Sequence, residues 1–177
     1  MQHNSKTFFI SLIITTVLLV LSDILVSTSF PLLGLDSFRV SLVVLIVLYL
    51  CFYFNNILIA PLIAYFYMVH GIFSLEHWSI GALSCLLVST LISFLRNLIH
   101  LDNFFVTFVF VQIFQTLIFI LTRGMMYLKL DQGSFVTESI KFFIPESLII
   151  SLTAPFLFTV LHKIWFRGDK DIEEARA

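Results

Sequence analysis

The feature that most constrains this chain is a run of 36 consecutive residues, 40–75, that contains no Asp, Glu, Lys or Arg. At about 1.5 Å per helical residue the run would extend roughly 54 Å, whereas the hydrocarbon core of a bilayer is about 30 Å thick. A single membrane span cannot use up the whole run, so the chain must turn within it. The turn is expected at Asn55 and Asn56, shortly before Pro61.

The rest of the composition agrees with a polytopic membrane protein. Hydrophobic residues make up 59% of the chain and charged residues 12%, against about 25% charged in a typical soluble domain. The net charge of −1 offers no basic surface, which argues against nucleic acid as a partner. The apolar runs do not alternate with polar residues as the strands of a membrane barrel do, so helices are expected.

The apolar runs predict one all-α transmembrane domain over residues 1–177, a bundle of six helices with a short charged tail. The first run could also pass for a signal peptide, but residues 26–29 make a poor cleavage site, so we interpret it as a retained helix. The expected spans are residues 7–28, 37–54, 57–75, 79–99, 103–127 and 140–165, with the tail at 166–177.

The basic residues at the joints predict the orientation, because cytoplasmic loops carry an excess of Lys and Arg. With the amino terminus inside, six basic residues fall on the cytoplasmic side and four on the other side. We therefore expect both termini in the cytoplasm. The two groups are Lys6, Arg96, Lys163, Arg167, Lys170 and Arg176, and Arg39, Arg123, Lys129 and Lys141.

Four ionisable residues fall inside the expected spans towards their outer ends: Asp23, His70, Arg123 and Glu146. A charge at the centre of a bilayer costs about 2.5–3.5 kcal/mol on insertion scales, so each needs a partner or a function. Arg123 could bridge Asp23, Glu146 or both as a structural contact. Alternatively, this polar layer could form a pocket for a ligand or a partner, since helix bundles build sites from convergent polar groups.

Other residues are expected to hold helices together. Gln112 and Gln115 lie three apart near the middle of the fifth span, where amides usually bond to a neighbouring helix. Ala60 and Ala64 form a pair of small residues that would allow close helix approach, as would Gly81. Two prolines fall in the sixth span, of which Pro145 is expected in its first turn and Pro155 is expected to kink it. Cys51 and Cys85 are interpreted as small buried hydrophobes.

The sequence shows no established catalytic or metal-binding motif, so no catalytic, metal-binding or cofactor-binding residue is expected. Serines are plentiful in the spans, and a serine nucleophile acting with His70 stays open, although no serine stands out.

Three stretches resemble the family of the bacterial rod shape-determining protein MreD. They are the run 31–50, which includes FRVSLVVLIVLYL; WSIGALSCLLVSTLISFLRNLI at 78–99; and ESLIISLTAPFLFTVLHKI at 146–164. The family often carries small residues and then an aspartate in the third span. Here Ala60 and Ala64 take the small positions, Met68 stands where the acid is expected, and His70 is the nearest polar residue.

The resemblance implies a non-catalytic scaffold of the cell-elongation complex in the bacterial inner membrane. It would bind the bitopic protein MreC and act indirectly with the actin-like MreB filament and the peptidoglycan synthases. The implied fold is that of the six-helix substrate-binding component of energy-coupling-factor transporters. The alternatives are a small-molecule carrier of that vitamin-binding type, with a pocket at the polar layer, and an intramembrane enzyme.

Overall fold

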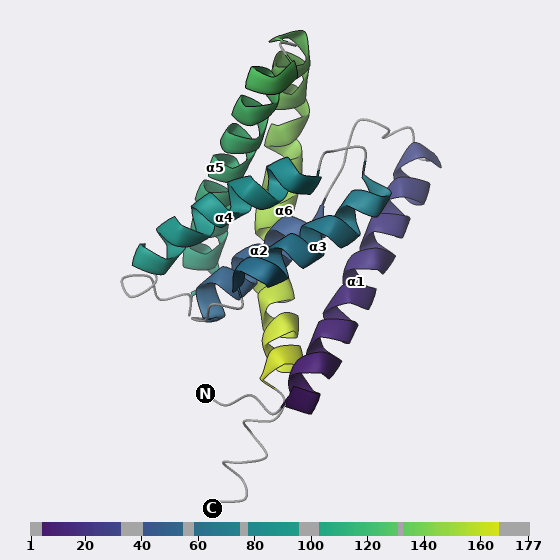
Figure 1. The fold of residues 1–177 in the computed structure, drawn as a ribbon, viewed down its shortest axis with the longest axis vertical. Coiled ribbons are helices and arrows are strands. Elements are labelled where there is room, and N and C mark those ends of the chain that lie inside the picture. The colour runs from purple at the N-terminus through teal and green to yellow at the C-terminus, as the bar shows by residue number, and fades with distance from the viewer. Residues whose placement is uncertain are drawn as a thin grey trace, which may run out of the picture.

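The computed structural model describes residues 5–32, 41–54, 59–74, 78–95, 103–130 and 133–166. These residues form helices only, which confirms the all-α class, and successive helices run in opposite directions (Figure 1). The beginning of the first helix lies beside the end of the last, where the Ser11 hydroxyl donates to the Ile164 carbonyl over 2.8 Å. The helices are α1 (Ser5–Leu32), α2 (Leu42–Tyr53), α3 (Ile59–Phe73), α4 (Trp78–Leu95), α5 (Phe104–Leu130) and α6 (Gly133–Trp165).

Four of these helices are long and apolar enough to cross a membrane, which indicates a membrane protein. Their apolar segments are Lys6–Ser29, Trp78–Leu95, Phe104–Leu128 and Ile140–Trp165. The other two helices, α2 and α3, are apolar but shorter, with 12 and 15 residues. A helix of that size extends about 18–23 Å, less than the hydrocarbon thickness of about 30 Å.

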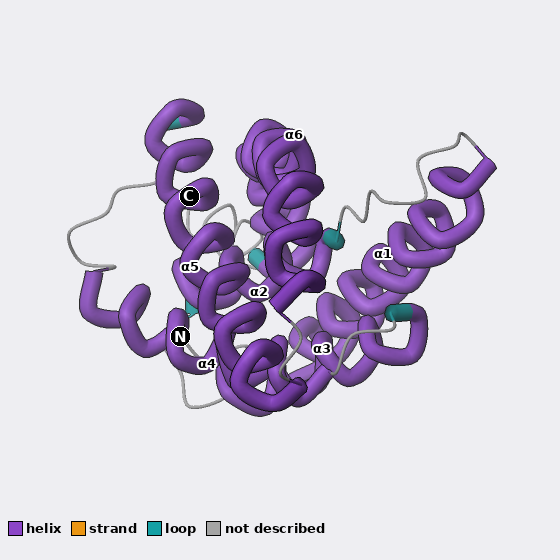
Figure 2. The backbone as a smooth tube through the Cα atoms, turned by 90° about the horizontal axis from the view of Figure 1, so that it is seen from above, coloured by secondary structure: helices purple, strands orange, loops and turns teal. Residues whose placement is uncertain are grey.

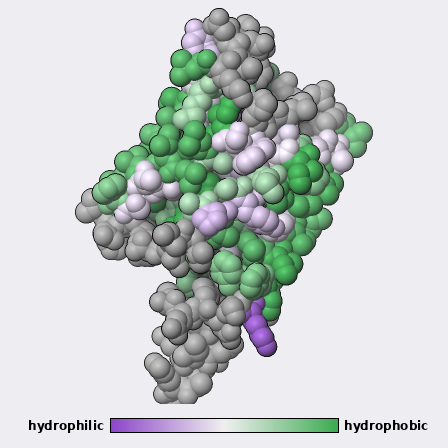
Figure 3. Space-filling view, in the orientation of Figure 1, coloured by the Kyte–Doolittle hydropathy of each residue, from purple (hydrophilic) through white to green (hydrophobic). Residues whose placement is uncertain are grey.

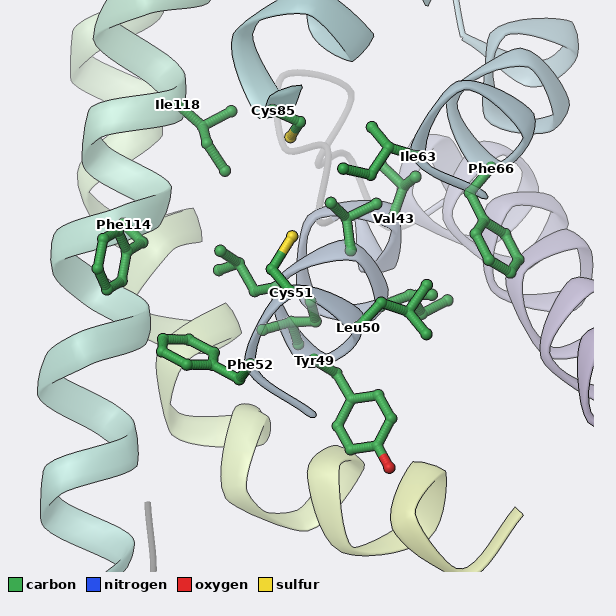
Figure 4. Close-up of a cluster of buried hydrophobic side chains, with 14 of the residues drawn as sticks. Val43, Tyr49, Leu50, Cys51, Phe52, Ile63, Phe66, Cys85, Phe114 and Ile118 are labelled. Carbon is green, nitrogen blue, oxygen red and sulfur yellow. The ribbon is translucent and has the colours of Figure 1, made fainter. Parts of the chain in front are cut away.

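The short helix α2 lies at the centre of the bundle and packs against each of the other helices (Figure 2). A helix that is apolar on every side must be enclosed by other helices or by lipid. Figure 4 shows its side chains reaching in all directions, with Phe52 towards Phe114 of α5 and Tyr49 towards α6. The buried residues of α2 are Val43, Leu45, Ile46, Val47, Leu48, Tyr49, Leu50, Cys51 and Phe52.

The predicted connection before the last helix is wrong. We expected a loop over residues 128–139 and the first helical turn near Pro145. Instead α5 continues to Leu130 and α6 already begins at Gly133, so Pro145 lies inside α6 together with Pro155. The polar residues of 134–141 lower the hydropathy of this stretch without preventing a helix. Hydropathy predicts which part of a helix can lie in a bilayer, and the helix can continue beyond that apolar part.

The first helix also differs from its prediction, because α1 continues through Pro31 to Leu32. The fourth helix is described as far as Leu95, and the rest of its expected span, 96–99, lies outside the described residues. The expected asparagine turn at Asn55 and Asn56 also lies outside them, as does the tail from residue 167. Both cysteines are free and buried, as predicted.

The helices α3 and α4 approach each other closely at two glycines. A Cβ placed on Gly81 would lie 2.6 Å from the Tyr67 ring, and one on Gly71 would lie 2.7 Å from the Trp78 Cβ. Both distances are shorter than real Cβ contacts, so the hairpin depends on glycine at these positions. Of the expected small pair, Ala60 is exposed and Ala64 is half-buried. Its role in helix packing stays a prediction.

Candidate functional site

A hydroxyl, an imidazole and a carboxylate from three helices meet at one place. The Asp23 Oδ2 of α1 lies 2.9 Å from the His70 Nδ1 of α3. The other ring nitrogen, His70 Nε2, lies 3.4 Å from the Oγ of Ser41, the residue before α2. Sequence reasoning identified Asp23 and His70 as members of one polar layer but did not single out Ser41.

The local sequence explains how each group reaches this place. Asp23 lies on the inner side of α1 and is only 6% exposed, while its neighbours Ile24 and Leu25 are exposed. His70 lies in the last turn of α3. Ser41 is the N-cap residue of α2 with extended backbone, yet its side chain makes no capping hydrogen bond. The Ser41 hydroxyl is therefore directed to the imidazole at the expense of the usual N-cap contact.

The two contacts fit one tautomer of the imidazole. In the tautomer that carries its proton on Nδ1, the ring donates to the Asp23 carboxylate. Its Nε2 then has a lone pair that can accept from the Ser41 hydroxyl. Burial of Asp23 with this partner satisfies a group that would otherwise be costly in an apolar bundle.

The two other members of the predicted polar layer lie in a different part of the molecule. Arg123 of α5 lies over the Phe119 ring, 5.5 Å from its centroid, and its Nη1 is 3.6 Å from the Met126 Sδ. Over the described residues α1 packs against neither α4 nor α5, and α3 packs against neither α5 nor α6. Asp23 thus pairs with His70, not with Arg123.

Glu146 is also displaced from Asp23. The contact between Thr15 and Trp165 brings α1 and α6 to one level, with the indole N–H donating to the hydroxyl over 3.1 Å. At about 1.5 Å per residue, Asp23 then lies about 12 Å along α1 from this level and Glu146 about 28 Å along α6. The four ionisable residues do not form one cluster.

A second polar cluster joins α5 to α6. Gln115 Nε2 donates to the Ser147 carbonyl and to the Ser151 hydroxyl, each over 2.6 Å. The Gln112 amide donates to the Ser147 hydroxyl over 3.0 Å, and its Oε1 accepts from Ser151 over 2.7 Å. The two glutamines therefore bond across helices, as their position in an apolar span suggests.

The serines that bond to the glutamines were not identified from the sequence, although their spacing could have indicated them. Ser147 and Ser151 are four residues apart and Gln112 and Gln115 three apart, so each pair lies on one face of its helix. The same holds for Ser11 and Thr15 of α1, which bond to the end of α6.

Among the described residues no three His, Cys, Asp or Glu side chains converge in a way that could hold a metal ion. Comparisons with models of protein families, with curated proteins and with solved structures found no match for this chain.

Proposed function

We propose that this chain is a membrane scaffold subunit of the bacterial cell-elongation complex, which supports rod shape and peptidoglycan synthesis. In that complex it acts through binding, with a bitopic protein of the MreC type as its direct partner and the MreB filament and synthases as indirect ones. The proposal rests on the resemblance of residues 31–50, 78–99 and 146–164 to the MreD family.

On the structural side, the proposal is supported by the contrast between polar contacts inside the bundle and apolar outer faces of its helices. Polar groups of different helices bond to one another at two places inside the bundle, as Gln115 does with Ser151 and His70 with Asp23. The outer faces of the four long helices are apolar, and the face drawn in Figure 3 is mainly hydrophobic where residues are described. A tightly bonded bundle with apolar sides suits a subunit that membrane proteins and lipid contact from outside.

The finer points of the proposal follow from the same resemblance and, for the orientation, from the Lys and Arg residues at the joints. The protein lies in the inner membrane with both termini in the cytoplasm, and its six helices adopt the arrangement of an energy-coupling-factor substrate-binding component. In this orientation the end of the bundle with Ser11 and Ile164 faces the cytoplasm. The Asp23–His70 pair then lies in the outer half of the membrane.

Co-purification in mild detergent tests the proposal. We expect the tagged protein to retain the MreC-type protein of the same cell. Four variants with a tryptophan on one outer face each should then locate the partner surface, since only the face in contact should lose the partner while the melting temperature is unchanged. The variants are Leu21→Trp, Leu87→Trp, Ile113→Trp and Leu152→Trp. Failure of the unmodified protein to retain the MreC-type protein would contradict the proposal.

The carrier alternative expected one pocket built from Asp23, His70, Arg123 and Glu146. These residues lie in two separate parts of the bundle, so no observation favours that alternative over the scaffold.

A further inference from the structure

The three groups around His70 are connected in the order hydroxyl, imidazole, carboxylate. Ser41 Oγ is next to Nε2 of the ring, and Asp23 is next to Nδ1. We propose that this cluster is a nucleophilic site that cleaves carboxylic esters of membrane lipids, with Ser41 as the nucleophile. This activity is additional to the scaffold role, which itself requires no reaction.

The connectivity gives each group a distinct role. The lone pair on His70 Nε2 can take the hydroxyl proton, which makes His70 the general base. Asp23 accepts from Nδ1, which holds the ring in the tautomer that leaves Nε2 free. The distance of 3.4 Å between Ser41 and the ring is at the long end for a hydrogen bond, which is common in such sites before substrate binds.

Burial is graded as this chemistry requires. The Asp23 side chain is 5% exposed and the His70 side chain 17% exposed. Ser41 is half-buried. Burial is therefore greatest at the carboxylate and lower at the other two residues.

Ser41 differs from other hydroxyl residues of the bundle. Ser22, Thr28 and Ser89 each donate to a carbonyl of the preceding turn of their own helix. Such a hydroxyl is occupied by the backbone. Ser41 precedes its helix, makes no capping hydrogen bond and has the imidazole as its partner.

The start of α2 also supplies a means to stabilise the oxyanion. The first backbone N–H groups of a helix have no partner within it, and they carry the positive end of the helix dipole. Ser41 immediately precedes these groups, and its side chain leaves them uncapped. An oxyanion formed at a carbonyl attached to Ser41 would therefore lie next to N–H donors that the Ser41 side chain leaves uncapped.

The surroundings point to a lipid ester as the substrate. The two helices that carry Asp23 and His70 have exposed apolar side chains on their outer faces, with Leu21 and Leu25 on α1 and Met68 and Ile72 on α3. An acyl chain would remain in the apolar layer along these helices. Its ester group would reach Ser41 at the end of α2.

The reaction balances with water as the only co-reactant. Ser41 Oγ forms a bond to the ester carbonyl carbon, and its proton moves to His70 Nε2. The carbon–alkoxide bond then breaks, and the alkoxide leaves as an alcohol with the proton from His70. Water, deprotonated by His70, releases the fatty acid from Ser41 and restores the hydroxyl.

The test uses the full-length protein in lipid nanodiscs and a fluorophosphonate probe, in which attack by a serine oxygen displaces fluoride from phosphorus. We expect one adduct per chain, located on Ser41 by mass spectrometry, and hydrolysis of p-nitrophenyl octanoate by the same sample. Ser41→Ala should abolish both, and His70→Ala should slow both by about 10²–10⁴-fold. Ser22→Ala, a half-buried serine at the level of Asp23, is the matched control and should change neither.

Asp23 is a positioning residue, so the effect of its substitution on kcat is measured separately from the effect on KM. Asp23→Asn should lower kcat for the p-nitrophenyl ester by at least about tenfold and leave KM within about twofold, because substrate contacts are retained. Melting temperatures confirm that each variant is folded. If Ser41 is labelled no faster than Ser22, or if His70→Ala reacts as fast as the unmodified protein, the proposal is overturned.

Discussion

At the scale of single residues, Ser151 shows how polar groups stabilise this apolar bundle. Its side chain is fully buried and accepts from Gln115 while donating to Gln112. Hydrogen bonds between membrane helices contribute about 0.6 kcal/mol on average and up to about 1.7 kcal/mol. Ser151 takes part in two such bonds, and without it the Gln115 amide retains the Ser147 carbonyl and the Gln112 Oε1 as acceptors.

We therefore expect Ser151→Ala to lower the free energy of unfolding by about 1–3 kcal/mol, measured by denaturation in mixed micelles. The matched control is Ser93→Ala on α4, an exposed serine whose hydroxyl donates to Thr90 of its own helix. That change should cost less than about 0.5 kcal/mol. Equal losses of unfolding free energy for the two substitutions would show that the hydrogen bonds between α5 and α6 stabilise the protein no more than an exposed serine does.

The sequence identifies a polar contact residue inside an apolar span only when residues of that type are rare there. The apolar spans contain few amides and few charges, so Gln112, Gln115, Asp23 and His70 stood out. Serine is frequent in these spans and inexpensive in a helix, where it bonds to its own backbone. Ser41, Ser147 and Ser151 could therefore be distinguished only by which side chains face them, and that requires the fold.

At the scale of helices, the α3–α4 hairpin is held at short distance by Gly81. Tyr67, whose ring contacts Gly81, is buried and its hydroxyl lies 2.9 Å from the Cys85 sulfur. A methyl group at Gly81 would displace this ring and break the contact with Cys85. We expect Gly81→Ala to lower the melting temperature by several degrees.

The same substitution at Gly124 of α5 controls for the effect of removing a glycine. A Cβ there meets nothing within 4 Å, and alanine favours a helix by about 1 kcal/mol over glycine. Gly124→Ala should therefore leave the melting temperature unchanged or raise it. A melting temperature for Gly81→Ala at or above that of the unmodified protein would contradict the close approach of α3 and α4.

The central helix α2 gives a second prediction at this scale. Leu45 is 0% exposed, and its truncation in Leu45→Ala should leave a cavity and cost about 2–5 kcal/mol of unfolding free energy. Leu87→Ala on α4, where the leucine is 46% exposed, should cost much less because lipid fills the space. Comparable losses in micelles would mean that α2 is not the core of the bundle.

The position of α2 illustrates what the pattern of apolar residues could not show. In water, an apolar helix is recognised as the core because its neighbours have polar faces. In a bilayer the outer faces are apolar too, so a central and a peripheral helix have similar sequences. The absence of charge from residues 40–75 predicted two helices, but that α2 is enclosed by the others follows only from the packing.

For the whole molecule, the beginning of α1 lies beside the end of α6, so the proposed topology places both on the same side of the membrane. Lys6 and Lys163 are both exposed near that end, and Thr28 is exposed near the opposite end of α1. Single cysteines at these positions can be labelled with a maleimide that does not cross membranes, while Cys51 and Cys85 are buried.

We expect Lys6→Cys and Lys163→Cys to react in inverted membrane vesicles but not in intact spheroplasts, and Thr28→Cys to show the reverse. Reaction of Lys6→Cys and Lys163→Cys from opposite sides would contradict an even number of crossings. Reaction of both from the outside would preserve the bundle but reverse the proposed orientation.

The measurement that tests the central claim most directly is the shape of cells depleted of this protein. As a scaffold of the elongation complex, the protein should be required for rod shape, so depletion should produce rounded cells, and expression of the unmodified chain should restore rods. Depleted cells that keep their rod shape and elongate at the normal rate would contradict the proposed function.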